Sequence, residues 1–441
     1  MEVLAASSSV DAGIACWDLR SGTEHLRYRS CASPPHGLLS ISRRFLASSQ
    51  LRENPSSCSA PIFFWSWDKP QVQVRSFPAE PIGPMVSDSN GAYIIGGGAL
   101  GTIYLWEVAT GKLLNKWNAH YRSVTCLALS EDESLLISGS EDGSVRVWSL
   151  LMIFDKVARE VGGNVYIYSF MEHALRVTSV VSGHGLCNSI VISSSEDRSC
   201  KIWSLSTGSL LRSVIFPSAI DAIALDPGEH TFYAGGRDGK IYIAVLNAEW
   251  DPRRNFGKFI NGSLSDQSKA ITCLAFSSDG VTLVSGSEDG IVRVWNTMSE
   301  QMTRLLKYGK GPVSNVVIVR QPINFSHLSL SRKQLNLLLP PPLDRYSDPL
   351  ESEVDFKAVK VLHQHYNHLD DSCYFSASVM NSQIKELQEN ASAGAMEMEL
   401  ERSRIESKRA MQVAQQWKKL YLDLQNTCVN EFLNGVDIDA K

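Results

Sequence analysis

Alternating apolar and polar positions recur along residues 1–320 in short runs separated by tight turns. Residues 145–148 read Val-Arg-Val-Trp, and such alternation predicts a β-strand with one buried face. The preceding Asp142-Gly143 pair predicts a tight turn, because glycine tolerates positive φ. The phrase at 138–148 returns at 285–295 with ten of its eleven positions identical. The chain therefore contains a repeated strand–turn–strand unit.

Five weaker copies of this unit align on the residue that closes its second strand. One copy has alanine at this position where the others have tryptophan. The seven closing positions are spaced by 48, 41, 42, 55, 41 and 51 residues: Trp17, Trp65, Trp106, Trp148, Trp203, Ala244 and Trp295. A period of about 40–45 residues with four short strands is typical of β-propeller blades. The sequence therefore predicts an all-β, seven-bladed propeller over residues 1–320.

The first blade is one strand short at the N-terminus. Residues 2–29 supply only three strand-like runs, whereas each complete unit needs four. Residues 312–319 follow the last blade and alternate in the manner of a strand. We expect this run to add the innermost strand of the first blade. Joining the two ends of the propeller in this way closes the ring and removes its exposed strand edges.

These repeats resemble the WD-repeat family in their closing tryptophans and Asp-Gly turns. The resemblance implies a hydrogen-bonded set in each blade: a histidine before the first strand, a serine or threonine on the second, the turn aspartate and the tryptophan. Two blades match fully, the last has Gln267 for histidine, and the others lack most of the set. The implied structural residues are His120, Ser138, Asp142, Trp148, His173, Ser193, Asp197, Trp203, Ser285, Asp289 and Trp295.

The Asp, His and Ser residues of these sets also have the composition of a nucleophilic triad. Their recurrence in several blades favours a structural network, because buried polar groups must be paired. No Gly-x-Ser-x-Gly sequence accompanies them. Residues 96–101 match the Gly-x-Gly-x-x-Gly phosphate-binding pattern, but a strand follows instead of a helix, so we expect a hairpin turn. We predict a protein that is not an enzyme, with no catalytic, cofactor-binding or metal-binding residues.

Composition argues against several classes of protein: those drawn to nucleic acid or lipid by their overall charge, secreted proteins and membrane proteins. The 441 residues carry a net charge of −5, which provides no global attraction to nucleic acid or anionic lipid. Nine scattered cysteines without a Cys-x-x-Cys pair favour buried thiols in a reducing compartment. The first residues lack the charged and apolar regions of a signal peptide, and no apolar run is long enough to span a membrane.

Two long connections interrupt the propeller pattern, at 150–170 and 246–266. The sequence of the first connection predicts a short helix. Both connections are candidate sites for binding a partner, and insertions without a function are an equal alternative. Residues 321–375 contain a Leu-Leu-Leu-Pro-Pro-Pro run and predict an extended linker or a strap laid over the propeller. Three histidines lie within 363–368, where a solvated loop is favoured over a metal site.

Residues 376–426 change to a helical period with dense charges between the apolar positions. Such a long helix does not bury its apolar stripe alone, so it pairs with itself or a partner, or docks on the propeller. We favour a self-associating coiled coil, followed by a flexible tail at 427–441. The expected interface is Ile384, Leu387, Ala391, Met398, Ile405, Ala414, Trp417, Tyr421 and Leu424.

Further stretches narrow the resemblance to one branch of the WD-repeat proteins. They are residues 21–29, 105–114, 120–121, 172–175 and 310–315. With the linker and terminal helix, they resemble the WD-repeat subunit of the nuclear complex that matures the large ribosomal subunit, whose plant members form the root initiation defective family. The similarity extends over nearly the whole chain and is weakest at 321–375.

This resemblance implies a non-enzymatic scaffold in the nucleoplasm or nucleolus. Its implied partners are a large helical-repeat scaffold subunit, a HEAT-like subunit, the AAA ATPase midasin and the pre-ribosomal particle, with homodimerisation through the C-terminal helix. Its implied role is removal of spacer RNA from pre-rRNA during large-subunit assembly. The alternative is a WD-repeat adaptor or substrate receptor in a ubiquitin-ligase or chromatin complex. Direct RNA contact and the import signal are left open by the sequence.

Overall fold

The computed structural model describes residues 2–10, 12–42, 45–51, 60–67, 69–154, 166–184, 189–246, 259–265, 269–309, 311–320 and 340–346. The chain divides into two units, Met1–Asp348 and Pro349–Lys441, and all described residues belong to the first. The predicted coiled coil, the tail, the histidine-rich segment and Gln267 lie outside the described residues.

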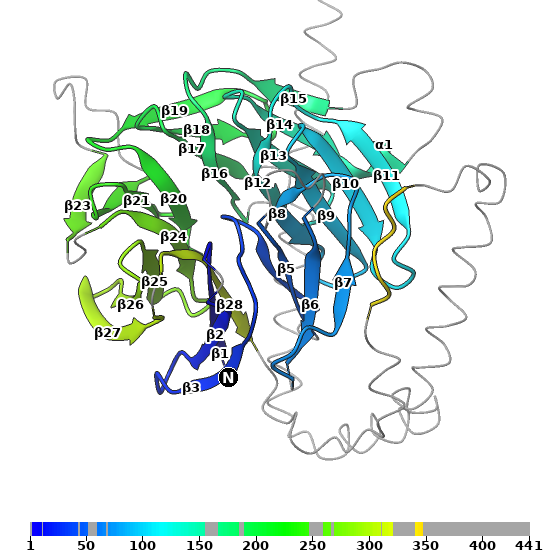
Figure 1. Cartoon of the computed structure of the whole chain (residues 1–441). Helices are drawn as coiled ribbons and strands as arrows, with labels where there is room; N and C mark the ends of the chain where they lie inside the picture. The colour runs from blue at the N-terminus through cyan, green and yellow to red at the C-terminus, as the bar shows by residue number, and fades with distance from the viewer. Residues whose placement is uncertain are drawn as a thin grey trace, which may run out of the picture. The chain divides into compact units, whose positions relative to one another are not determined.

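Seven four-stranded antiparallel sheets form the described part of the first unit (Figure 1). From the inner to the outer strand, blades 1 and 2 consist of β28 (Val313–Arg320), β1 (Glu2–Ser8), β2 (Ile14–Asp18) and β3 (Glu24–Tyr28), then β4 (Leu38–Ile41), β5 (Phe45–Ser49), β6 (Ile62–Ser66) and β7 (Val74–Ser76). Blades 3 and 4 consist of β8 (Ile82–Ser87), β9 (Tyr93–Gly98), β10 (Thr102–Glu107) and β11 (Leu113–Asn118), then β12 (Val124–Leu129), β13 (Leu135–Ser140), β14 (Val145–Ser149) and β15 (Tyr166–Phe170).

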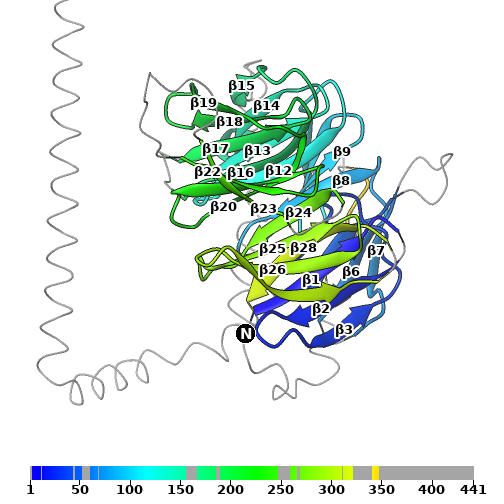
Figure 2. The same cartoon turned by 90° about the vertical axis from the view of Figure 1, so that its left-hand side faces the viewer.

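The remaining three blades follow the same plan. They consist of β16 (Val177–Ser182), β17 (Ile190–Ser195), β18 (Ser199–Ser204) and β19 (Leu210–Ile215), then β20 (Ile220–Leu225), β21 (Thr231–Gly236), β22 (Ile241–Val245) and β23 (Ile260–Leu264), and finally β24 (Ile271–Phe276), β25 (Thr282–Ser287), β26 (Ile291–Asn296) and β27 (Gln301–Lys307). Figure 2 shows these sheets from the side. The predicted seven-bladed, all-β propeller is confirmed.

The ring closes where the two ends of the propeller meet. Strand β28 pairs with β1 in an antiparallel register that places Leu4 opposite Ile318. An ion pair between Glu2 and Arg320, with Nε and Oε1 3.3 Å apart, marks one end of this pairing. The predicted closing strand is therefore confirmed, with its bounds at Val313–Arg320. Full pairing leaves no open sheet edge between the first and last blades.

The hydrophobic core is divided among the seams between neighbouring blades. Seven clusters of buried side chains form, and each combines residues of two adjacent sheets. Each sheet is covered on both faces, so its strands carry apolar residues on both sides. The closing tryptophans contribute the largest of these side chains: Trp65, Trp106 and Trp203 are all less than 2% exposed.

Two smaller expectations concern turns and connections. Residues 96–101 form the end of β9 and the turn into β10, with φ +87° at Gly101, so the predicted hairpin is confirmed. A Cβ atom at Gly101 would lie 2.2 Å from the carbonyl oxygen of His120, which explains the need for glycine. The long connection after β14 begins with helix α1 (Leu150–Phe154), as predicted, and residues 155–165 lie outside the described ranges.

Residues Pro340–Tyr346, within the predicted linker, lie against the propeller. This segment, drawn in gold, runs beside β7 and β11 (Figure 1). Leu343 is only 4% exposed and joins the cluster between blades 2 and 3. Leu343 is therefore packed against the propeller, and the rest of the predicted linker, beyond Pro340–Tyr346, lies outside the described residues.

Candidate functional site

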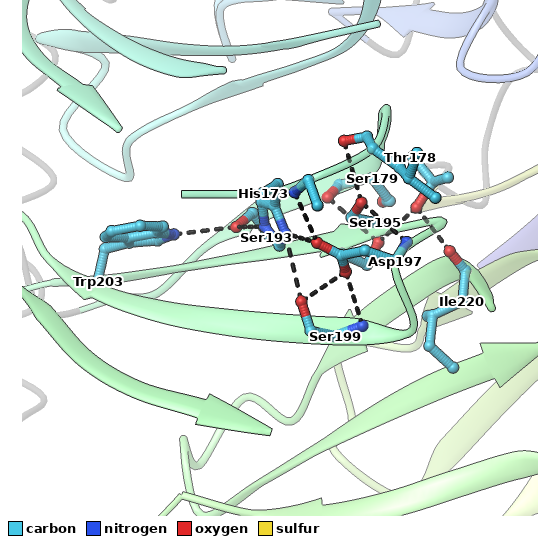
Figure 3. Close-up of polar contacts among 12 residues, drawn as sticks. His173, Thr178, Ser179, Ser193, Ser195, Asp197, Ser199, Trp203 and Ile220 are labelled. Carbon is cyan, nitrogen blue, oxygen red and sulfur yellow. Dashed lines mark hydrogen bonds and ion pairs between the residues drawn. The ribbon is translucent and has the colours of Figure 1, made fainter. Parts of the chain in front are cut away.

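Blade 5 contains the full set of polar residues expected from the family resemblance. Strand β18 carries Trp203, β17 carries Ser193, the turn between these strands carries Asp197, and the connection before β16 carries His173. The Trp203 indole nitrogen lies 2.9 Å from Ser193 Oγ, and that oxygen lies 2.8 Å from His173 Nε2. His173 Nδ1 lies 3.1 Å from Asp197 Oδ2 (Figure 3). The four side chains form one continuous chain of hydrogen bonds.

The direction of these hydrogen bonds follows from donor chemistry. An indole N–H only donates, so the Ser193 oxygen accepts a hydrogen bond from Trp203. The Ser193 hydroxyl in turn donates a hydrogen bond to His173 Nε2. The His173 ring then carries its proton on Nδ1 and donates it to the Asp197 carboxylate. Burial lowers the pKa of His173, and the hydrogen bond with Asp197 opposes this effect only in part. The imidazole is therefore neutral near pH 7.

The turn aspartate also organises the backbone around it. Asp197 Oδ1 accepts hydrogen bonds from the backbone N–H and the hydroxyl of Ser199, and Oδ2 accepts one from the backbone N–H of Ala174. Burial alone would raise the pKa of Asp197, but its hydrogen bonds from Ser199 and His173 lower it below the ordinary value. The ionised carboxylate links the hairpin turn of blade 5 to the connection arriving from blade 4.

Blade 4 repeats this arrangement, with the turn hydroxyl of Ser144 in the place that Ser199 holds in blade 5. Ser138 Oγ lies 2.8 Å from the Trp148 indole nitrogen and 2.7 Å from His120 Nε2. His120 Nδ1 lies 2.9 Å from Ser144 Oγ and 3.6 Å from Asp142 Oδ2, so the hydroxyl relays the contact. Burial lowers the pKa of His120, whereas the pKa of Asp142 is lowered against the effect of burial by the nearby His120 ring and by hydrogen bonds from Ser144.

Blade 7 contains only part of the expected set. The Trp295 indole nitrogen lies 2.9 Å from Ser285 Oγ, as in the other two blades. Asp289 instead pairs with Arg293, whose Nη2 atom lies 2.8 Å from Asp289 Oδ2. Arg293 is 6% exposed, so the guanidinium occupies a buried position beside the turn. The histidine position belongs to Gln267, which is outside the described residues.

Sequence reasoning missed two further acid pairings. In blade 6, where Ala244 replaces the tryptophan, the hydroxyl of Tyr242 donates to the turn residue Asp238. In blade 3, Glu80 is buried and accepts a hydrogen bond from the backbone N–H of Leu100 at 2.7 Å. Burial raises the pKa of nearby Tyr104, and the Glu80 carboxylate raises it further. The sequence did contain a signal for these pairings. The strand position two residues before the closing residue holds tyrosine in blades 3 and 6 and arginine in blade 7.

The geometry of the complete sets determines what they can do chemically. Ser138 and Ser193 are both completely buried, and each hydroxyl is held between an indole and an imidazole. A nucleophile must reach its substrate, and neither of these oxygens is exposed to one. The sets therefore act as buried polar links between strands. Among the described residues, no group of three or more His, Cys, Asp or Glu is placed to hold a metal ion.

Comparisons with known proteins agree with these blades. The family model described as WD domain, G-beta repeat matches residues 111–149, 164–204 and 259–296, which contain the three most complete sets. The Arabidopsis thaliana protein ROOT INITIATION DEFECTIVE 3 is 50% identical over 441 residues, covering 97% of each chain. Human WD repeat-containing protein 18 is 33% identical and covers 74% of each chain.

This chain belongs to their WD-repeat family. A more distant relative of this family is the pre-rRNA-processing protein crb3/ipi3 of Schizosaccharomyces pombe, which is 27% identical over 60% of this chain and 68% of its own length. The crystal structure of the computationally designed Ika8 protein is similar in fold, with a TM-score of 0.51, 24% identity, and coverage of 70% of this chain and 85% of that one. Within the described part of the chain, no helix is long and apolar enough to cross a membrane.

Proposed function

We propose that this protein is a non-enzymatic scaffold of a nuclear complex that processes spacer RNA in pre-rRNA and assembles the large ribosomal subunit. The observation that carries the proposal is its membership of a family whose relatives include proteins named for pre-rRNA processing. The propeller geometry supports a scaffold, because the polar sets are buried within the blades and leave the outer surface for binding.

One face of the propeller supports binding to other proteins. The connections β7–β8, β9–β10, β11–β12 and β15–β16 lie at the same end of their sheets, because they all follow strands that run in one direction. Five large apolar side chains on these connections are exposed: Phe77, Leu100, Tyr121, Met171 and Leu175. Clustered exposed apolar side chains commonly mark protein interfaces. We assign this arc over blades 2 to 5 to a helical-repeat partner.

The C-terminal part of the chain contributes the remaining elements of the proposal. We propose that residues 376–426 form a coiled coil through Ile384 to Leu424 and make the protein a homodimer. The proposed partners are the helical-repeat and HEAT-like subunits, midasin and the pre-ribosomal particle. These assignments rest on the sequence and on the family resemblance.

The complex is tested by a tagged pull-down from nuclear extract, separated on a sucrose gradient and probed for RNA. We expect co-sedimentation with particles that carry unprocessed spacer RNA and with midasin. A light, RNA-free peak containing ubiquitin-ligase or chromatin subunits would contradict the proposal.

The binding face is tested by the double variant Leu100→Asp, Tyr121→Asp in the same pull-down. Both side chains are more than three-quarters exposed, at 77% and 87%, so the blades should fold normally. We expect loss of the helical-repeat partner. The matched control is Leu211→Asp, Ile215→Asp on the outer strand β19, which exposes apolar side chains of similar size and should keep the partner. Equal loss in both variants would contradict the assignment of the face.

The proposed dimer is tested by deleting residues 376–441 and measuring mass by light scattering. We expect the mass to fall from that of a dimer to that of a monomer, with the propeller still folded by circular dichroism. An unchanged mass after correction for the deleted residues would instead indicate that the C-terminal helix does not drive self-association.

A further inference from the structure

The seam between blades 2 and 3 is completed by a segment from outside the ring. Residues Pro340–Tyr346 lie along this seam, although they follow the last propeller strand in sequence. Leu343 inserts its side chain into the cluster that contains Phe64, Met85 and Trp106, and it is 4% exposed. The neighbouring side chains of Pro342 and Asp344 are exposed. Leu343 therefore anchors the segment, and Pro340 at its start is also buried.

Three hydrogen bonds fix the backbone of this segment. The backbone N–H of Leu343 donates to Ser76 Oγ at 2.9 Å, and that of Asp344 donates to the carbonyl of Gly111 at 2.7 Å. The carbonyl of Asp344 accepts from the Trp106 indole nitrogen at 3.0 Å. Backbone hydrogen bonds combined with a pocket for one side chain are a common arrangement in peptide recognition.

The Trp106 indole N–H is able to bond to the linker because the neighbouring strand carries a small residue beside it. Gly96 occupies the strand position that Ser138 and Ser193 hold in blades 4 and 5. A Cβ atom at Gly96 would lie 3.0 Å from Trp106 Cζ3, so the ring edge packs where the serine side chain would be. Blade 3 therefore supplies no hydroxyl for this indole, and its N–H bonds to the linker instead.

The turn of blade 3 is also shaped to admit the prolines. Gly111 has φ +74°, and a Cβ atom there would lie 2.5 Å from the carbonyl oxygen of Pro342 and 3.2 Å from Pro341 Cγ. A larger residue would collide with the segment and would also be strained by the backbone conformation. The two prolines in turn favour the extended conformation that presents Leu343 and its backbone to the seam.

We propose that the seam between blades 2 and 3 is a peptide-binding site for an extended Pro-Pro-Leu sequence, with residues 341–343 of this chain as its occupant. Recognition depends on the buried leucine and on the backbone of the residue that follows it. The side chain of that following residue is exposed and is not read by the site. The site is independent of the proposed role in ribosome assembly, and its test requires no ribosomal component.

The test uses the full-length chain with Leu343→Ser, which weakens the internal occupant. A fluorescein-labelled peptide with the sequence of residues 338–347 is titrated, and binding is followed by fluorescence anisotropy. We expect the variant to bind the peptide at least about tenfold more tightly than the wild-type chain, in which the site is already filled. Equal binding by both chains, or no binding by the folded variant, would overturn the proposal.

Variants of the peptide and of the seam test whether binding depends on the leucine and on the hydrogen bonds of the site. A peptide with serine for the leucine should not bind, whereas one with alanine for the following aspartate should bind as well as the original. In the Leu343→Ser chain, Ser76→Ala and Trp106→Phe should each weaken binding about tenfold, because each removes one hydrogen-bonding group from the site. Circular dichroism confirms that each chain is folded. Binding that ignores both the peptide leucine and these two positions would overturn the site.

Discussion

Blades 5 and 3 satisfy the same chemical requirement in different ways. Both carry a closing tryptophan that is almost completely buried, and in both the indole N–H has an acceptor, as most buried donors do. In blade 5 the acceptor is Ser193 on the adjacent strand, within a network that continues to Asp197. In blade 3 it is the backbone carbonyl of Asp344, which arrives from the linker.

The comparison teaches that an irregular blade need not be a defective one. Blade 5 is self-sufficient, because its polar set comes from its own strands, its turn and the connection leading into it. Blade 3 lacks the serine, and its unused donor becomes a binding position for another segment. The cost of a buried donor without an acceptor is about 1–3 kcal/mol, and the hydrogen bond from Trp106 to the linker avoids this cost in blade 3.

Replacing the whole indole should have the largest effect, and a similar one in both blades. We expect Trp203→Ala and Trp106→Ala each to lower the free energy of unfolding by about 3–5 kcal/mol, because both changes leave a large cavity in a seam. Urea denaturation measures the loss. Tyr121→Ala is the control, since Tyr121 is 87% exposed and its removal should change the value by less than about 0.5 kcal/mol. Wild-type stability for either tryptophan variant would contradict its packing role.

Removing only the hydroxyl should distinguish the internal network of blade 5. Ser193→Ala leaves the Trp203 indole and His173 Nε2 without their shared partner, so we expect a loss of about 1–3 kcal/mol by urea denaturation. Ser213→Ala on the exposed outer strand is the matched control and should have little effect. Similar stability for these two variants would argue against the network.

Introducing the missing serine into blade 3 should destabilise the blade instead of repairing it. A Cβ atom at position 96 would lie 2.8 Å from Ile82 Cγ2 and 3.0 Å from Trp106 Cζ3. We therefore expect Gly96→Ser to cost about 1–3 kcal/mol through overpacking. An increase in melting temperature, with the linker released to trypsin at Arg345, would show that the serine had instead captured the indole.

The smallest expected effect is a pH dependence to which the complete blades contribute. Burial lowers the pKa of His120, His173 and also His36 in the folded protein, so the unfolded chain binds protons at higher pH than the folded one. Stability therefore falls as pH decreases below about 6.5, by less than about 1.4 kcal/mol per histidine per pH unit. Lowered pKa values of Asp142 and Asp197 act in the same direction at lower pH.

Urea denaturation at pH 7.5 and 5.5 measures this dependence. We expect His173→Gln to reduce the difference in stability between the two pH values, because one of the imidazoles whose pKa is lowered by burial is removed. Ser193→Ala, which retains His173 while lowering stability, serves as the control for a general loss of stability. An unchanged difference in His173→Gln would contradict the assignment of the pH dependence to this residue.

Much of the propeller could be predicted from local sequence. Asp-Gly turns and closing tryptophans located the blades, because a turn conformation and a buried aromatic position are local requirements. The incomplete first blade also indicated that residues 312–319 close the ring. The Asp289–Arg293 and Asp238–Tyr242 pairs were missed, since they depend on which side chain fills the space left by a different residue. The coiled coil at 376–426 stays a prediction.

The sequence by itself determined the repeat and the number of blades, and its resemblance to the WD-repeat family indicated the residues that pair within blades 4 and 5. These features depend on strand alternation and on residues brought together by a single four-stranded sheet. Only the tertiary structure decided that Asp344 completes the hydrogen bonding of Trp106, 238 residues away. No local pattern records such a contact, because it depends on the shape of a seam formed by two blades and on the path of a linker between distant segments.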